Sequence, residues 1–379
     1  MDLTFSPAEE AFRREVREWL AANVPNPPLP SGDTREGFAA HLDWERRLFD
    51  ARLAVVSWPE AYGGRDASLW EWIIFEEEYY RAGAPQRVTQ NGIFLLAPSI
   101  FMFGTPAQQD RYLPRMASGE ETWGQGWSEP EAGSDLAGVK SRATRDDAAG
   151  GWRLSGQKTW TTRGAFCTHM FGLFRSDPEA ERHRGLTYFL VPLDAPGVTV
   201  RGFGRLDGDE GFAEVFLDDV FVPDDCVLGE VHQGWGVAMA TAGSERGLTL
   251  RSPGRFTAAA QRLVDLWREH GDPADTGLRD ALTRVWIDAE AYRLQTLEVV
   301  TTLSGGGHSG PEASMVKIFW SELDIRIHEL AQRILGTRAE LEGPWSKGWQ
   351  FSLSGPIYAG TNEIQRNVVA ERVLGLPRK

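Results

Sequence analysis

The chain has 379 residues, which is enough for two or three domains with buried cores. Hydrophobic residues make up 41% and charged residues 25% of it, and this composition excludes the disordered, collagen-like and membrane classes. The net charge is −14, with Lys and Arg scattered along the chain, so nucleic acid is not an expected partner. The two cysteines, Cys167 and Cys226, and the spacing of the seven histidines predict neither a disulfide scaffold nor a metal site.

The first residues, Met1-Asp2-Leu3-Thr4-Phe5, lack the basic region and apolar run of a signal peptide. No stretch of the sequence approaches the roughly 20 apolar residues that a membrane span requires. We therefore expect a cytoplasmic protein with no membrane association.

Helical signals fill the first third of the chain. Ser6-Pro7-Ala8-Glu9 has the form of a capping box with proline at the first helical position, and Thr105-Pro106-Ala107-Gln108 repeats it. From about Glu120 the pattern changes to short β-rich runs such as Thr187–Val191, and long helical patterns return after Gly229. The sequence predicts three domains: a helical domain over 1–119, a β-domain over 120–230 and a helical bundle over 231–379.

Two runs in the β-rich region combine aromatic faces, hydroxyl groups and glycines. The first covers Trp123–Asp135 and the second covers Gly156–Thr162. Such residues suit a polar ring system that carries phosphates, because glycine lets backbone N–H groups approach a ligand closely. Taken singly, the first run is more typical of a glycine-rich turn, and the second run is more typical of an ordinary strand. Their occurrence together favours a shared binding face.

Four fragments in the same order identify a family resemblance: Trp58–Gly64, Trp127–Asp135, Gly156–Thr162 and Tyr358–Arg366. From end to end the chain resembles an acyl-CoA dehydrogenase. The resemblance implies an α+β multidomain fold, with an N-terminal helical domain, a middle β-barrel or sandwich domain and a C-terminal four-helix bundle. It also implies FAD as the cofactor and an acyl-CoA thioester as the substrate.

The resemblance further assigns residues to the cofactor. Trp127, Ser128 and Thr162 would lie beside the isoalloxazine ring, and Trp160 would stack near its face. Gly133 and Ser134 would lie near the FAD pyrophosphate or the thioester arm of the substrate. The full set of expected FAD contacts is Gln125, Trp127, Ser128, Gly133, Ser134, Trp160, Thr161, Thr162, Thr361, Asn362 and Glu363.

The expected reaction removes a proton next to the thioester and transfers a hydride from the following carbon to flavin N5, so it needs a carboxylate base in a dry site. Many relatives place that glutamate immediately before the Gly-Thr of the closing motif, where this chain has Ala359. Glu245 is the alternative base, because its position matches the isovaleryl-CoA and long-chain branches of the family. A solvated helix carboxylate is the other interpretation of Glu245.

Three neighbouring roles follow from the same resemblance. The backbone N–H of Ala359 would donate to the thioester carbonyl, as any residue except proline can. Arg246 would be a cation on the substrate side. Glu363 is a carboxylate in the closing motif, but its position matches a flavin contact, so it ranks below Glu245 as the base.

The chain departs from the family pattern where many relatives supply an Arg-x-x-Phe-Gly segment to the FAD of a neighbouring subunit. Here the sequence is Trp267-Arg268-Glu269-His270-Gly271-Asp272-Pro273. The chain could therefore form a homo-oligomer, either a dimer or a tetramer, or a heterotetramer with a related subunit that completes the FAD site. An electron-transfer flavoprotein is the expected electron acceptor.

Two other functions on the same scaffold stay open. The chain could be a partner subunit that stabilises the site of another chain, or a flavin oxidase or monooxygenase. Fold alone does not separate these functions, and the sequence does not indicate the acyl group.

Overall fold

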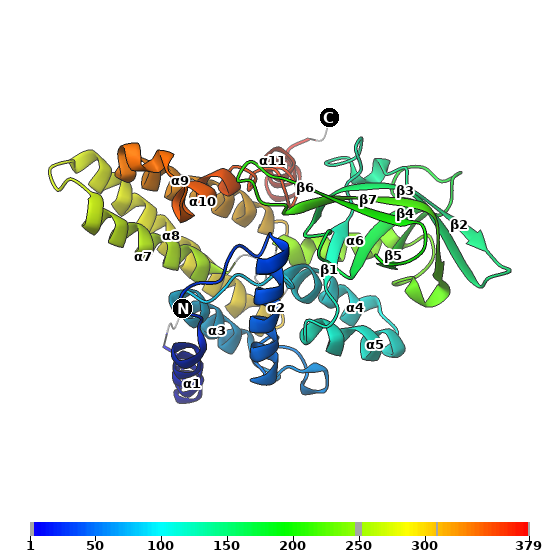
Figure 1. Cartoon of the computed structure of the whole chain (residues 1–379), viewed down its shortest axis with the longest axis horizontal. Helices are drawn as coiled ribbons and strands as arrows, with labels where there is room; N and C mark the ends of the chain where they lie inside the picture. Colours follow the sequence, from blue (N-terminus) through cyan, green and yellow to red (C-terminus); the bar gives the residue numbers. More distant parts are fainter. Residues whose placement is uncertain (1–3, 247–251, 308–309, 378–379) are drawn as a thin grey trace. The chain divides into compact units, whose positions relative to one another are not determined.

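The computed structural model describes residues 4–246, 252–307 and 310–377, with only the backbone described at 244–246 (Figure 1). The chain forms two compact units. We call residues 1–25, 67–84 and 246–379 the helical unit, and residues 26–66 and 85–245 the β-unit. The helices at the start of the chain are thus divided between the two units. Among the described residues, no helix is long and apolar enough to cross a membrane.

The β-unit is built on a sheet that has seven strands in the described part of the chain, with the order β1-β4-β2-β3-β7-β6 and with β5 paired to β4 (Figure 1). The strands are β1 (Trp123–Gly126), β2 (Arg142–Asp146), β3 (Gly151–Thr162), β4 (His169–Arg175), β5 (Leu186–Pro192), β6 (Val198–Phe203) and β7 (Phe212–Pro223). The pairs β1·β4 and β2·β4 are parallel, and the other pairs are antiparallel. The core on this sheet includes Leu154, Phe174, Phe189, Val215 and Val220.

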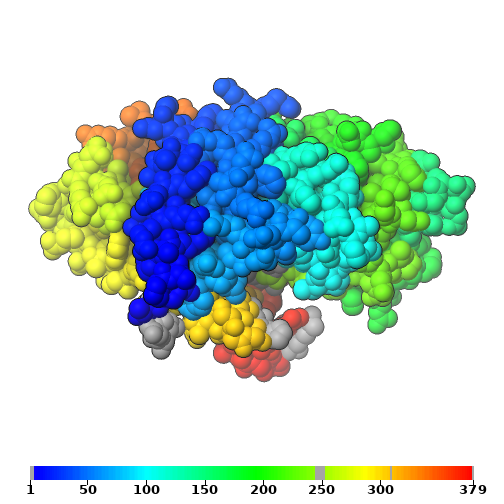
Figure 2. Space-filling view, turned by 90° about the horizontal axis from the view of Figure 1, so that it is seen from below, coloured from blue at the N-terminus to red at the C-terminus, as the bar shows by residue number. Residues whose placement is uncertain are grey.

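The β-unit also contains helices, and α5 (Pro106–Ala117) makes polar contacts to the segment that follows β7. The helices are α2 (Arg35–Asp50), the π-helix Asn91–Leu96, α4 (Ala97–Phe103), α5 and α6 (Gly234–Arg246). Thr105 and Gln108 form the predicted capping box of α5. The Gln108 side chain also donates to the carbonyl oxygens of Asp225 at 2.8 Å and Val227 at 2.7 Å. The cyan surface of α4 and α5 accordingly adjoins the green surface of the strands (Figure 2).

The helical unit contains the first helix of the chain together with the long C-terminal helices. Its helices are α1 (Pro7–Asn23), α3 (Leu69–Arg81), α7 (Pro253–His270), α8 (Thr276–Ser304), α9 (Ala313–Leu335), α10 (Pro344–Ser352) and α11 (Asn362–Val368). Large side chains from three of these helices form its core: Phe256, Tyr292, Trp320, Leu323 and Ile327. The capping box predicted at Ser6 is present and begins α1. The predicted layout of helices before and after a middle sheet is confirmed.

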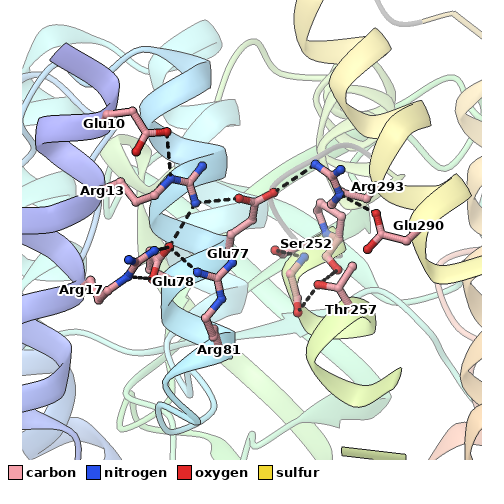
Figure 3. A network of polar contacts seen from close by, with 12 residues as sticks. Glu10, Arg13, Arg17, Glu77, Glu78, Arg81, Ser252, Thr257, Glu290 and Arg293 are labelled. Carbon is pink, nitrogen blue, oxygen red and sulfur yellow. Dashed lines mark hydrogen bonds and ion pairs between the residues drawn. The ribbon is translucent and has the colours of Figure 1, made fainter. Parts of the chain in front are cut away.

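Glu78 on α3 is the centre of an ion-pair network that joins α1, α3 and α8 (Figure 3). Its side chain is 2% exposed and receives hydrogen bonds from three guanidinium groups, Arg13 at 3.1 Å, Arg17 at 2.9 Å and Arg81 at 2.9 Å. Arg13 also binds Glu77 at 2.9 Å, and Glu77 lies 3.7 Å from Arg293 of α8. Burial opposes ionisation, but the hydrogen bonds from Arg17 and Arg13 hold the pKa of Glu78 below its ordinary value.

We expect Glu78→Gln to destabilise the protein by about 3 kcal/mol at neutral pH, because it leaves buried Arg13 without a full counter-charge. A carboxyl group with a lowered folded pKa stabilises the fold above its unfolded pKa, and this contribution disappears as the pH falls through the folded value. The thermal unfolding midpoints of variant and wild type should therefore begin to approach each other below about pH 4 and meet only below the lowered pKa of Glu78. Differential scanning calorimetry from pH 3 to 8 measures this.

The matched control is Glu10→Gln, because Glu10 lies on the same surface of α1, 3.7 Å from Arg13, with 45% of its side chain exposed. We expect it to change stability by less than about 1 kcal/mol. Equal effects of the two substitutions would contradict the central role of Glu78.

Candidate functional site

Trp127 and Ser128 follow the end of β1 and are tied directly to the second motif of the sequence. Trp127 is 9% exposed, and the Ser128 carbonyl accepts a hydrogen bond of 2.9 Å from the backbone N–H of Thr159 on β3. Gln125 lies on β1 itself, opposite Phe171 of β4. A Cβ on Gly124 would lie 2.7 Å from a methyl group of Thr161, so only glycine allows β1 and β3 to pack this closely here.

A buried ion pair between Lys158 and Glu129 fixes the same two motifs to each other. Lys158 is completely buried, and its Nζ donates to Glu129 Oε1 at 2.7 Å and to the Leu173 carbonyl at 2.7 Å. Glu129 also accepts from the backbone N–H groups of Lys140 at 2.6 Å and Ser141 at 3.0 Å. Burial lowers the pKa of Lys158, while Lys158 and the backbone donors hold the pKa of Glu129 below its ordinary value against the effect of burial.

The end of β3 contains a bulge that exposes an indole. The register with β7 shifts between Lys158 and Thr161, and Trp160 within the shift has a φ of +59°. Trp160 is 59% exposed, which is unusual for so large an apolar side chain. Its ring packs edge-on against Phe203 at 5.2 Å and Phe212 at 5.6 Å. These two rings fix one edge of the indole, and much of its surface stays available to a ligand.

Two buried polar atoms near this bulge are orphans, which means that they have no hydrogen-bond partner among the described residues. Among the described residues, neither Trp127 Nε1 nor Thr161 Oγ1 has a hydrogen-bond partner, although Thr161 is completely buried. Buried donors are normally satisfied, and an unpaired donor at a candidate site suggests a partner that the chain itself does not supply. Thr162 follows at the last position of β3 and is partly exposed.

Asp33 anchors the chain that leaves β3. Its carboxylate accepts from Arg163 Nε at 2.6 Å and from Arg205 Nη1 at 2.7 Å. Burial opposes ionisation, but Arg163 and Arg205 hold the pKa of Asp33 below its ordinary value. The pairs bind the segment before α2 to the sheet directly after Thr162, so the position of the bulge depends on charges distant in the sequence.

Gly133 and Ser134 lie in an exposed loop after the bridge between Glu129 and Ala132. A Cβ built on Gly133 would meet no described atom within 4 Å. The loop therefore offers backbone that a ligand can approach without obstruction.

The closing motif lies in the helical unit as a turn with two successive left-handed residues. Ala359 has a φ of +58° and Gly360 a φ of +75°. The Gln365 side chain is completely buried and donates to the carbonyls of Ala359 at 2.9 Å and Gly360 at 3.4 Å. Thr361 caps α11 by accepting from the N–H of Ile364. The backbone of this turn is consequently held from inside the unit.

Asn362 and Glu363, the first two residues of α11, differ in their surroundings. Asn362 is 2% exposed, and its carboxamide is directed at side chains of α9. Glu363 is exposed to solvent, and its own backbone N–H holds the pKa of its carboxyl group below the ordinary value. Glu363 thus has the character of a solvated, ionised carboxylate.

Glu245 and Arg246 end α6, and their side chains lie outside the described residues. The backbone of α6 is well anchored: Thr241, one turn earlier, is completely buried and hydrogen-bonds to Ser99 at 2.7 Å and to the Tyr188 hydroxyl at 3.3 Å. The structure thus groups Gln125 to Thr162 in the β-unit and Ala359 to Glu363 in the helical unit. The role of each residue remains a prediction.

The residues of the β-unit group suit FAD as the resemblance predicts. An exposed indole offers a flat face, the orphan donors Trp127 Nε1 and Thr161 Oγ1 can meet ring heteroatoms, and Gly133 leaves open backbone. In the part of the chain that the structure describes, no cluster of His, Cys, Asp and Glu could hold a metal ion.

Sequence reasoning gave no role to Lys158, Glu129 or Lys317, although the first two belong to the quoted motifs. A charged residue inside an otherwise aromatic and glycine-rich motif indicates a buried ion pair, since charged residues are seldom buried without a partner. The sequence does not show which partner each one has.

Comparison with known proteins identifies the same three regions. The acyl-CoA dehydrogenase N-terminal domain is matched by residues 6–120, the middle domain by residues 124–220 and the C-terminal domain by residues 232–374. Acyl-CoA dehydrogenase IpdE1 of Mycobacterium tuberculosis is 40% identical over 383 residues, covering 98% of each chain.

Two solved structures share the fold over the full chain. The structure named Tcur3481-Tcur3483 steroid ACAD matches with a TM-score of 0.89 and 26% identity, covering 100% of both chains. The ChsE4-ChsE5 complex from Mycobacterium tuberculosis matches with a TM-score of 0.85 and 28% identity, again covering 100% of both chains.

The Lys158–Glu129 pair predicts a strong energetic coupling. Lys158→Met should destabilise the protein by about 3–5 kcal/mol, because it leaves a buried carboxylate without its cation. The double variant Lys158→Met with Glu129→Gln should recover a large part of this loss, since both charges are then removed. Chemical denaturation of the four proteins of the cycle measures the coupling.

Lys140→Met is the control, because Lys140 pairs with Glu131 at the surface, with 75% of each side chain exposed. It should cost less than about 1 kcal/mol. Additive effects in the cycle would show that the buried pair does not join the two motifs.

Proposed function

Since the chain belongs to the acyl-CoA dehydrogenase family of FAD-dependent oxidoreductases, we propose that it oxidises an acyl-CoA thioester to a trans-2-enoyl-CoA with Glu245 as the general base. The observation that carries the choice of base is Ala359. It occupies the position where many relatives have the catalytic glutamate, and its methyl group cannot accept a proton.

The surroundings of Glu363 argue against it as the base. Glu363 is exposed, and a carboxylate with a lowered pKa in water is a weak base. Glu245 follows the buried Thr241 on α6, a helix whose backbone is anchored to two neighbouring elements. We therefore propose the base on α6 and not on α11.

In the proposed mechanism, Glu245 removes the proton from the carbon next to the thioester. The backbone N–H of Ala359 donates to the thioester carbonyl oxygen, where negative charge develops as the proton leaves. Bound FAD supplies the two-electron acceptor for the hydride of the adjacent carbon. Trp127, Ser128, Thr161 and Thr162 are proposed to hold the ring, with Gln125 and Trp160 beside it.

Ser134 and Arg246 are proposed on the side of the substrate. Ser134 lies in the exposed loop after Ala132, where its hydroxyl is available to a ligand. Gly133 in the same loop is proposed near the FAD pyrophosphate, and Thr361 and Glu363 near the flavin.

We propose that the acyl group is steroid-derived. One similar structure is called a steroid ACAD, and at 26% identity over the whole chain it is more than a likeness of fold. Anaerobic titration with straight-chain, branched and steroid-derived acyl-CoA thioesters would test this, with bleaching of the flavin absorbance as the readout. Fastest bleaching by a straight-chain thioester would contradict the steroid-derived acyl group. A separate measurement tests the alternative function: rapid oxygen consumption by the reduced protein would indicate an oxidase.

We propose a related but unlike chain as the partner. Both similar structures carry two protein names, and one is called a complex. The segment 267–273 stands where many relatives have the Arg-x-x-Phe-Gly segment, and its Arg268 pairs with Asp265 on its own helix at 3.1 Å. A partner chain would then complete the FAD site, and an electron-transfer flavoprotein would reoxidise the enzyme.

We expect Glu245→Gln to retain FAD and to lower the rate of flavin reduction by about a thousandfold, because the amide cannot take the proton. Stopped-flow absorbance under anaerobic conditions measures this with the thioester that bleaches the wild type fastest. Glu363→Gln tests the rival carboxylate, and with FAD bound it should keep most of that rate.

Ala359→Gly is a second control, since the proposed role uses only the backbone. Glycine adopts a φ near +58° without strain, so this variant should remain active and fold normally. For the first variant, a wild-type rate of flavin reduction in Glu245→Gln would show that Glu245 is not the base.

The proposed partner predicts that the chain purified alone holds less than one FAD per chain. Co-expression with a related chain should raise the FAD content, because that chain supplies the missing phosphate contacts. Flavin absorbance after denaturation and analytical ultracentrifugation measure these values. A homotetramer with one FAD per chain would contradict the proposal.

A further inference from the structure

Lys317 on α9 is a completely buried lysine in the core of the helical unit. Its Nζ donates to Asn362 Oδ1 at 2.8 Å and lies 5.9 Å from the centre of the Trp320 ring. Removing an ammonium group from water is costly unless the charge is paired and hydrogen-bonded. Its retention beside the closing motif therefore calls for an explanation beyond packing.

Asn362 is held by three side chains of α9. Its Oδ1 accepts from Lys317 and from Ser321 Oγ at 3.2 Å, while its Nδ2 lies 3.5 Å from Glu322 Oε1. Its own backbone N–H donates to the Pro356 carbonyl at 2.8 Å. Since the side chain is 2% exposed, its carboxamide is directed into the unit and has a single orientation that satisfies these partners.

The residues just before Asn362 have a costly backbone conformation. Ala359 is left-handed without being glycine, and Gly360 is left-handed as well. Such conformations persist where the surrounding structure determines them from several sides. Here Gln365 fixes the two carbonyls, and Lys317 fixes the residue that follows the turn.

We propose that Lys317 is a positioning residue: acting through Asn362, it fixes the backbone of Ala359, Gly360 and Thr361 in the conformation that presents this turn to FAD and the thioester. This inference rests on the proposed function. It also gives the Asn362 side chain the role of an internal anchor for the turn. A charge-assisted hydrogen bond from a buried cation suits this task, because it is stronger and more directional than a neutral contact.

FAD itself is the probe for the test, so that the result does not depend on the base. The dissociation constant of FAD and the visible flavin spectrum are measured for Lys317→Met, Asn362→Leu and the double variant, each with its partner chain where one co-purifies. We expect each single variant to weaken FAD binding about tenfold or more and to shift the flavin absorbance bands. Because both substitutions break the same link, the double variant should bind FAD no more weakly than either single variant.

Thermal unfolding of the same proteins separates positioning from mere stabilisation. Lys317→Met leaves the buried Asn362 Oδ1 with only its longer contact to Ser321, whereas the double variant removes both members of the Lys317–Asn362 bond and should recover much of the lost stability. A purely structural role predicts that FAD affinity recovers together with stability. The positioning role predicts that stability recovers while FAD affinity and the flavin spectrum do not.

Two further variants keep the test decisive if Lys317→Met does not fold. Asn362→Asp combined with Glu322→Gln retains the acceptor for Lys317 without placing two carboxylates side by side, and it should retain FAD affinity within about threefold. Lys347→Met removes a lysine on α10 of the same unit, which pairs with Glu342 at 3.7 Å and has 35% of its side chain exposed, and it should leave FAD binding unchanged. Loss of binding in Lys347→Met, or normal binding in Asn362→Leu, would overturn the proposal. Loss of activity alone in Glu245→Gln would leave it intact.

Discussion

The cost of burying a cation is the constraint on which the candidate site depends. The chain has five lysines, and two of them, Lys158 and Lys317, are completely buried, one in each compact unit. A buried ammonium group must find a fixed set of acceptors, and it thereby fixes the acceptors in turn. Lys158 binds Glu129 next to Trp127 and Ser128, and Lys317 binds Asn362 next to Thr361. A buried lysine thus fixes a residue in each of the two groups of predicted site residues.

Both groups contain a non-glycine residue with a left-handed backbone. Trp160 and Ala359 have φ values of +59° and +58°, conformations that cost about 1–3 kcal/mol each. Trp160 lies two residues after Lys158 in a bulge of β3, and Ala359 lies three residues before Asn362. In each group a nearby residue, Lys158 or Asn362, is held by a buried hydrogen bond. This contact opposes relaxation of the strained backbone, because relaxation would disturb it. The buried lysines therefore help to stabilise the strained backbone in both groups.

Local signals in the sequence predicted the local structure, including the capping boxes at Ser6 and Thr105 and the change from helices to strands. The ion pairs between residues that are distant in the sequence were not predicted. The Arg13–Glu78 pair joins α1 to α3, and the Glu77–Arg293 pair joins α3 to α8, so two helices from the first third of the chain belong to the helical unit. Lys158 and Glu129 are visible as residues of two motifs, but only the fold shows that they pair. Periodicity reports which face of a helix is apolar, and it does not report which distant charge a buried group meets.

The replacement at Ala359 separates two requirements that many relatives meet with one residue. A base must be a carboxylate near the substrate carbon, and a side chain on another element can provide it, as we propose for Glu245 on α6. Stabilising charge on the thioester oxygen requires an oriented backbone N–H, which depends on the conformation of the turn and on no particular side chain. Ala359 has a left-handed conformation and no carboxylate, and Gln365 holds its carbonyl in place. A strained backbone that several contacts hold is typical of a functional site. The conformation of the turn therefore favours an active site with its base on another element over one whose function has been lost.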